Sequence, residues 1–238
     1  MMKRILSAAA LAAACCAGDA MADEQRSWAW SPLGVGIAAP VQLPFTDSDI
    51  YGIRFGGVFG WNADVYGCDA GIVEFSTGDV AGIQGSALSW TVGSVYGIQG
   101  ALAANVVDGN FYGIQAAPVN VNWGDVWGLQ AGAVGYLNSL RGILVGGYNW
   151  INASAYGWQT GIANATQEES IGLSAGCVNY AMRSIGCQVG LVNLADEATG
   201  CQIGVVNAVE RMRGVQIGLL NVIGEGALPI MVVANANF

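Results

Sequence analysis

The sequence predicts an all-β protein that forms an antiparallel transmembrane β-barrel of about 14 strands. Three observations lead to this prediction. A glycine-centred unit recurs along the chain at intervals of 14 to 16 residues, and residues within each unit alternate between two faces. Charged residues make up only 11% of the 238 residues, well below the share of about 25% that is usual in soluble domains. A surface with so few charges suits lipid better than water.

The N-terminal segment, residues 1–22, is typical of a secretory signal peptide. Lys3 and Arg4 precede an apolar stretch, and Ala20-Met21-Ala22 supplies the small residues of a cleavage site before Asp23. The apolar stretch is shorter than the ~20 residues that a membrane-spanning helix needs. We therefore expect a bacterial type of export signal.

The remaining chain, residues 23–238, is expected to be a single repeat-built β domain. It has no lysine and no histidine, and the whole chain has a net charge of −9. An acidic protein with so few cations is a poor partner for nucleic acid, and the lack of histidine excludes His-dependent catalysis and His metal ligands. Cys15 follows an alanine run that resembles a lipidation motif, and its lipidation is left open.

The repeated unit is a glycine followed by an apolar residue and often by glutamine. In the unit at Tyr96, one face carries Tyr96, Ile98 and Gly100, and the other carries Gly97 and Gln99. A period of two indicates a β-strand, and glycine at this density disfavours a helix. The repeat glycines are Gly52, Gly67, Gly82, Gly97, Gly113, Gly128, Gly142, Gly157, Gly172, Gly186, Gly200 and Gly214.

Turn-forming residues separate the units. Thr77-Gly78-Asp79 and Asp108-Gly109-Asn110 are two examples, and such pairs between alternating runs indicate β-hairpins. About ten to eleven residues then remain for each strand, which matches the ~9–11 residues of a tilted membrane-spanning strand. Most Asp and Glu residues lie at these turns, where we interpret them as turn formers rather than as an acid–base pair or a calcium site.

Two further strands, expected around Ser27–Leu43 and at Leu228–Phe238, would open and close the barrel. The closing strand ends on an aromatic residue and resembles the terminal strand of outer-membrane barrels. Aromatic residues gather on both sides of the turns, as aromatic girdles do. The second face of the strands would line the lumen, and its glutamines are Gln84, Gln99, Gln115, Gln130, Gln159, Gln188, Gln202 and Gln216.

The alternative is a parallel β-solenoid of about 12 short coils, because near-identical units favour the stacking of like residues over like. The glutamines would then form a ladder, and Asn193, Asn207 and Asn221 would form another. However, coils ~4.8 Å apart would stack acidic residues such as Asp64 and Asp79 on one edge, which is unfavourable. A solenoid also needs a polar outer face, and neither face is charged. These arguments favour the barrel.

The last units, GCQVGLVN from Gly186, GCQIGVVN from Gly200 and GVQIGLLN from Gly214, are nearly identical. They resemble a family of bacterial surface-repeat proteins and lipoproteins with tandem G-hydrophobic-Q-x-G-hydrophobic-x-N units, and the ending ALPIMVVANANF fits that family. The resemblance covers Gly172–Phe238 well and Tyr51–Ile171 loosely. It implies a surface or outer-membrane location and carries over no catalytic residue.

Four cysteines remain beyond the signal segment. Cys187 and Cys201 occupy the same position in successive units, so a solenoid would place them within bonding distance, whereas a barrel would bring Cys177 close to Cys187. The simpler interpretation is that these cysteines and Cys68 replace Ile or Val as small apolar residues. No CxxC pair exists, and the sequence predicts neither a metal, a cofactor nor catalytic residues.

The sequence therefore predicts an exported protein of the bacterial outer membrane or cell surface, with a structural or passive-permeation role and no catalysis. Outer-membrane lipid is the expected partner, nucleic acid is not, and a surface partner or small polar solute stays unidentified. The alternative function is that of an exported β-solenoid surface protein for binding or adhesion.

Overall fold

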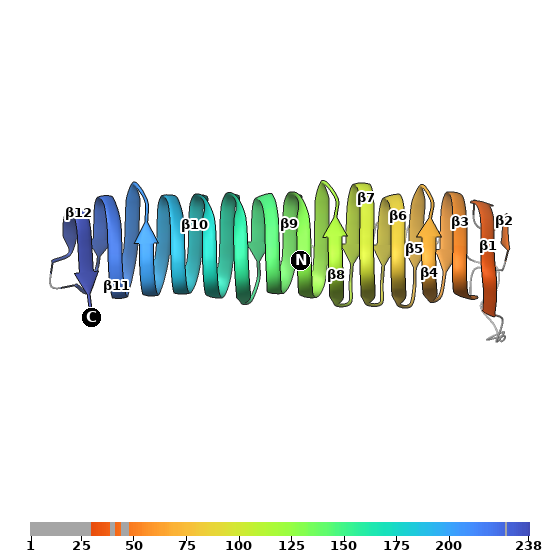
Figure 1. Ribbon diagram of the computed structural model, residues 1–238, viewed down its shortest axis with the longest axis horizontal. Coiled ribbons are helices and arrows are strands. Elements are labelled where there is room, and N and C mark those ends of the chain that lie inside the picture. Colours follow the sequence, from red (N-terminus) through yellow and green to blue (C-terminus); the bar gives the residue numbers. More distant parts are fainter. Residues whose placement is uncertain (1–29, 39–40, 44–47, 227) are drawn as a thin grey trace, which may run out of the picture.

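The computed structural model describes residues 30–38, 41–43, 48–226 and 228–238. These residues form an all-β parallel solenoid of about 12 turns, with coils stacked along one long axis (Figure 1). The alternative fold is therefore confirmed, and the 14-strand barrel is wrong. The expected signal peptide, residues 1–22, lies outside the described residues.

Twelve strands make up one continuous sheet system, in which β9 and β10 each run through more than one coil. The strands are β1 (Trp30–Ala38), β2 (Val41–Leu43), β3 (Asp49–Asn62), β4 (Val65–Ala70), β5 (Val73–Ser76), β6 (Val80–Thr91), β7 (Val95–Val107), β8 (Phe111–Ala116), β9 (Val119–Ile151), β10 (Ala155–Ile203), β11 (Val206–Ile223) and β12 (Ile230–Asn237).

Each coil has two arms, which the second coil shows most clearly. The first arm is β4, which contains the repeat glycine Gly67, and it is named the glycine arm. The second arm is β5, and it is named the return arm. Both pair in parallel with β3 on one side and with β6 on the other. Gly71-Ile72 forms the corner between the arms, here named the far corner. Thr77-Gly78-Asp79 links to the next coil, and the row of such links is named the turn edge.

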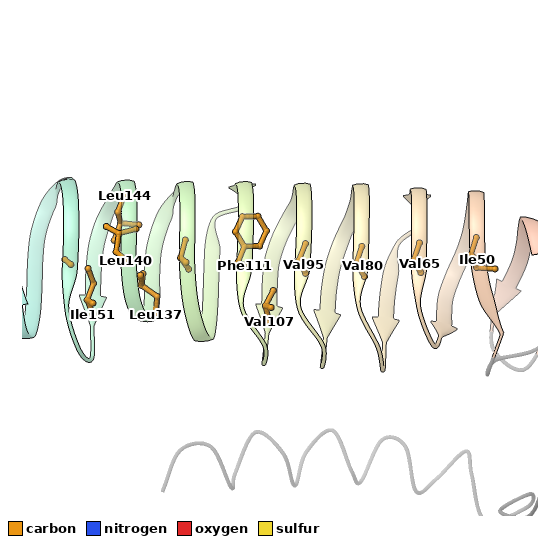
Figure 2. Packing of buried hydrophobic residues seen from close by; sticks show 12 residues of the cluster. Ile50, Val65, Val80, Val95, Val107, Phe111, Leu137, Leu140, Leu144 and Ile151 are labelled. Carbon is orange, nitrogen blue, oxygen red and sulfur yellow. The ribbon is translucent and has the colours of Figure 1, made fainter. Parts of the chain in front are cut away.

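The register places each repeat position over its equivalent in the next coil. Gly67 pairs with Gly82, Gly82 pairs with Gly97, and Gln84 pairs with Gln99. Alternation then sends one set of side chains into the space between the arms and the other set outward. The interior contains a column of buried apolar residues, including Val65, Val80, Val95 and Phe111 (Figure 2).

The two ends of the solenoid use antiparallel strands. At the N-terminal end, β1 pairs in parallel with β3 and antiparallel with β2. At the C-terminal end, β12 pairs antiparallel with β11. The segment that was expected to close a barrel, Leu228–Phe238, thus ends the solenoid instead. The only described residues of the expected opening strand are those of β1 and β2.

Acidic residues stack at the turn edge, and hydrogen bonds offset the expected repulsion. The backbone N–H of Asp79 donates to Asp64 Oδ1 at 2.6 Å, and that of Ser94 donates to Asp79 Oδ1 at 2.7 Å. Hydrogen bonds to a carboxylate are among the strong ones. Ser94 and Asn110 then continue the row without charge, with the Asn110 N–H donating to Ser94 Oγ at 3.1 Å.

In the C-terminal coils one row of the turn edge, Glu169, Arg183, Glu197, Arg211 and Glu225, carries charges of alternating sign. Arg183 lies 3.7 Å from Glu169 and 3.2 Å from Glu197. Arg211 forms a salt bridge with Glu197 and lies 3.8 Å from Glu225. Parallel stacking at a spacing of 14 residues thus places opposite charges next to each other. The expected like-charge repulsion therefore does not disfavour the solenoid, because backbone donors and arginines lie beside the stacked carboxylates.

The repeat glycines have a backbone conformation that other residues rarely adopt. All twelve have φ between 123° and 149°, a region that is essentially restricted to glycine. A Cβ atom on Gly97 would overlap the carbonyl oxygen of Gly82 in the preceding coil. Close contact between coils therefore requires glycine at this position.

We predict that Gly97→Ala lowers the free energy of unfolding by about 1–3 kcal/mol, because it adds both backbone strain and overlap. Gly100→Ala in the same coil is the matched control. A Cβ there meets only the Ala116 carbonyl oxygen at 4.0 Å, so this variant should be unchanged or slightly more stable. Urea unfolding followed by circular dichroism measures both variants, and equal losses would contradict the assigned role of the glycine row.

Candidate functional site

The glutamines that the barrel interpretation assigned to a lumen lie inside the solenoid. Their side chains fill the packed space between the two arms of each coil, so the lumen that they were expected to line is replaced by a solid interior. All are at most 2% exposed: Gln84, Gln99, Gln115, Gln130, Gln159, Gln188, Gln202 and Gln216.

Amide hydrogen bonds join these glutamines from coil to coil. Gln99 Nε2 donates to Gln84 Oε1 at 2.7 Å, and Gln216 Nε2 donates to Gln202 Oε1 at 2.7 Å. The glutamine ladder is interrupted near the middle of the rod, where Leu144 occupies the glutamine position and pairs with Gln159 in register. Gln159 finds a partner within its own coil instead, since its Nε2 donates to Thr166 Oγ1 at 3.1 Å. Such hydrogen bonds offset the cost of burying an amide.

A second ladder of asparagines lies where the return arm begins. Asn193 Nδ2 donates to Asn207 Oδ1 at 2.8 Å and to the Ile203 carbonyl oxygen at 3.0 Å. The ladder thus satisfies a backbone carbonyl next to the far corner. A Cβ atom on the corner glycine Gly204 would lie 2.7 Å from Asn193 Nδ2, so this corner also requires glycine.

Sequence reasoning identified only the last three members of the asparagine ladder. The other members occupy the same repeat position in earlier units. Aligning the return arms of successive units would have identified them. The buried members are Asn105, Asn120, Asn149, Asn164, Asn179, Asn193, Asn207 and Asn221.

A buried ionic cluster replaces the amide ladders in the first coils. Arg54 Nη1 donates to Asp69 Oδ1 at 2.8 Å and also to Glu74, and all three residues are at most 4% exposed. Arg54 and Asp69 occupy the glutamine position, while Glu74 occupies the asparagine position. Sequence reasoning missed this cluster because it assigned Asp and Glu residues to turns. The repeat register is the signal that would have found it.

One arginine neutralises only one of the two carboxylates, and this shifts their proton affinity. Burial and the neighbouring Asp69 charge raise the pKa of Glu74 to about 7, although Arg54 opposes the shift. Burial also raises the pKa of Asp69. Gly56 and Gly71 leave room for the Glu74 carboxylate, since a Cβ atom on either glycine would overlap it. The cluster is sealed from solvent and therefore cannot contact a substrate.

The disulfide that distinguishes the two folds is present between Cys187 and Cys201, whose Cα atoms are 4.8 Å apart. Parallel stacking places the same repeat position of successive coils at this distance, as expected for the solenoid. The Cys177–Cys187 link expected for a barrel does not form. Cys68 and Cys177 are free and exposed. In the described part of the chain, no group of three or more Cys, Asp or Glu side chains could hold a metal ion.

The outside of the solenoid carries aromatic rows next to the turn edge. On the glycine arm, Tyr51 and Tyr66 stack with ring centroids 4.8 Å apart, and Arg141 lies 4.3 Å over Trp127. The glycine-arm aromatic row consists of Tyr51, Tyr66, Tyr96, Tyr112, Trp127 and Tyr156. The return-arm aromatic row consists of Trp61, Phe75, Trp90, Tyr136, Trp150 and Tyr180.

Beyond the aromatic rows, the outer surface is aliphatic as far as the far corner. Ile83, Ile98 and Ile114 are about half exposed on the glycine arm. Exposed side chains of the far corner include Ile72, Leu102, Ile162, Cys177, Leu191, Val205 and Leu219. In the C-terminal coils, the corner glycines leave an open, uncharged groove of about 870 Å³ between apolar side chains.

Outward-facing charge is confined to one side of the rod. Within residues 48–226, every charged side chain that points outward lies at the turn edge or in the row beside it, where Arg141 and Arg213 are found. The solenoid therefore has amide ladders beside apolar columns inside, is apolar outside on both arms and at the far corner, and is charged along one edge. This arrangement reverses the usual distribution of a soluble protein.

Comparisons with known proteins identify no relative of this chain. No family model matches the chain, and no curated protein or solved structure is significantly similar to it. Within the part of the chain that the structure describes, no helix is long and apolar enough to cross a membrane.

We predict that the free energy of unfolding falls by roughly 2–3 kcal/mol as pH rises from about 5 to 8. The raised pKa of Glu74 means that the folded state holds this proton more tightly than the unfolded state. The stabilisation is complete below the unfolded pKa and is lost as pH rises through about 7. Chemical unfolding at a series of pH values measures it. Glu74→Gln should remove most of the slope, and a slope that this variant leaves intact would refute the assignment.

Proposed function

We propose that this protein is an exported β-solenoid that acts as a non-catalytic binding scaffold on the bacterial surface. The observation that carries the proposal is the apolar outer surface, with charge at one edge only. Contiguous exposed apolar surface on this scale marks an interaction site rather than a solvated face. A solenoid also offers a long, regular binding surface, since each coil presents the same positions.

Three features support export. Residues 1–22 have the pattern of a signal peptide, and the Cys187–Cys201 disulfide suits an oxidising compartment. The repeat units also resemble those of bacterial surface-repeat proteins and lipoproteins.

A binding role fits the described side chains better than catalysis does. The buried Glu74, with its raised pKa, lies inside the solenoid in contact with Arg54. Several carboxylates at the turn edge are held by backbone donors or by arginines, as in the Glu197–Arg211 pair. These groups are engaged in holding coils together.

Expression of the full chain in a Gram-negative host tests this proposal. We expect the mature protein in the envelope fraction, with Asp23 or a lipidated Cys15 at its N-terminus and with Cys187 joined to Cys201 under non-reducing conditions. Intact cells should expose it to a membrane-impermeant label. A reduced, full-length protein in the cytoplasmic fraction would overturn the proposal.

A further inference from the structure

The outward-facing residues of one coil follow an order that is characteristic of a membrane interface. From the turn edge, the order is charged or polar residues, then aromatic residues, then aliphatic residues, then the far corner. In the coil of β7, the aromatic residue is Tyr96, the aliphatic residue is Ile98, and the corner residue is Leu102, which is 82% exposed. Aromatic side chains lie at headgroup level in membrane proteins, and aliphatic side chains lie among acyl chains.

The same order occurs on both arms. Trp61 precedes the turn residue Asp64 by three positions, and Tyr66 follows it by two. Two aromatic rows therefore run along the rod from its N-terminal end, one on each side of the turn edge, and they end at Tyr156 on the glycine arm and at Tyr180 on the return arm. A flat partner protein, or a second copy stacked on one arm, would cover only one of these rows. A lipid leaflet covers both arms and the far corner at once.

The depth of the apolar surface matches one leaflet. The straight part of the glycine arm from Tyr96 to Gly100 spans four residues, about 13 Å along a strand, and Leu102 extends beyond it at the far corner. Half of the hydrocarbon core of a bilayer is about 15 Å thick. An aromatic row at the interface would thus leave the far corner near the end of the acyl chains.

We propose that the solenoid lies lengthwise in a single leaflet, with its far corner among the acyl chains, its aromatic rows at the headgroups and its turn edge in water. This inference rests on the proposed surface function and names lipid as the partner. Because residues 23–238 contain no lysine and the turn edge is mainly acidic, electrostatic attraction to anionic headgroups contributes little. Binding is driven by apolar contact, so a zwitterionic membrane suffices.

Flotation of the purified mature protein with phosphatidylcholine vesicles tests the proposal. Leu102→Glu puts a charge at the far corner, and Val92→Glu puts the same charge at the turn edge; both side chains are exposed in the structure. We expect Leu102→Glu to weaken partitioning at least about tenfold, while Val92→Glu leaves it unchanged. Circular dichroism and the Cys187–Cys201 bond verify that both variants fold.

Thiol labelling adds a measure of depth. Cys177 is a free, exposed residue at the far corner, and Val92→Cys places a thiol at the turn edge. The labelling rate of each thiol in vesicle-bound protein is divided by the rate of the same thiol in urea-unfolded protein. By this measure, a water-soluble maleimide should label Cys177 at least about tenfold more slowly than the cysteine at position 92.

Three results would overturn the inference. The first is failure of the wild-type protein to float, the second is equal flotation of the two glutamate variants, and the third is equal labelling of the two thiols. A soluble dimer that excludes vesicles would show that a second copy covers the apolar arms. If such a protein is still exported and labelled on intact cells, the surface function stands and only the lipid partner is wrong.

Discussion

Parallel in-register stacking of the coils is the constraint on which the rest of this structure depends. It requires a glycine such as Gly97 where the backbone of one coil comes close to the carbonyl oxygen of the next. It also places each side chain directly beside its equivalent in the neighbouring coil. Amides are well suited to this arrangement, because each one both donates and accepts at the strand spacing. The Gln99–Gln84 and Asn193–Asn207 bonds follow from this geometry.

The amide ladders explain why the interior is polar, and thereby why the exterior can be apolar. A narrow solenoid has little volume for a conventional core, and its apolar columns are interleaved with the amides. Cohesion between coils comes from backbone and amide hydrogen bonds and from the buried apolar column. The outward rows add ring stacking and the Cys187–Cys201 disulfide, and their remaining apolar surface is available for contact with a partner. Outward charge lies at the turn edge or in the row beside it, so the apolar contact surface faces away from that edge.

Much of the local structure was predictable from the sequence. The two-residue alternation and the position of the turns agree with the sequence pattern, because both depend on interactions within one unit. The expected β-hairpins are wrong, since the turns link strands that pair in parallel with the next coil. The predicted preference for a barrel over a solenoid is wrong, because acidic residues such as Asp64 and Asp79 are not free charges. Their carboxylates in fact accept backbone N–H groups from the next coil. The buried Arg54–Asp69–Glu74 cluster was missed for a related reason, since its members are brought together only by the register.

The sequence by itself determined that the chain is all β, that one unit recurs, and that Cys187 and Cys201 occupy equivalent positions. Only the tertiary structure decided whether consecutive units run parallel or antiparallel, and thus whether the glutamines surround a lumen or fill an interior. The physical reason is that alternation specifies which residues share a face, while the direction of the next strand depends on contacts between units. Those contacts, from the glycine row to the paired amides, exist only once the coils are stacked.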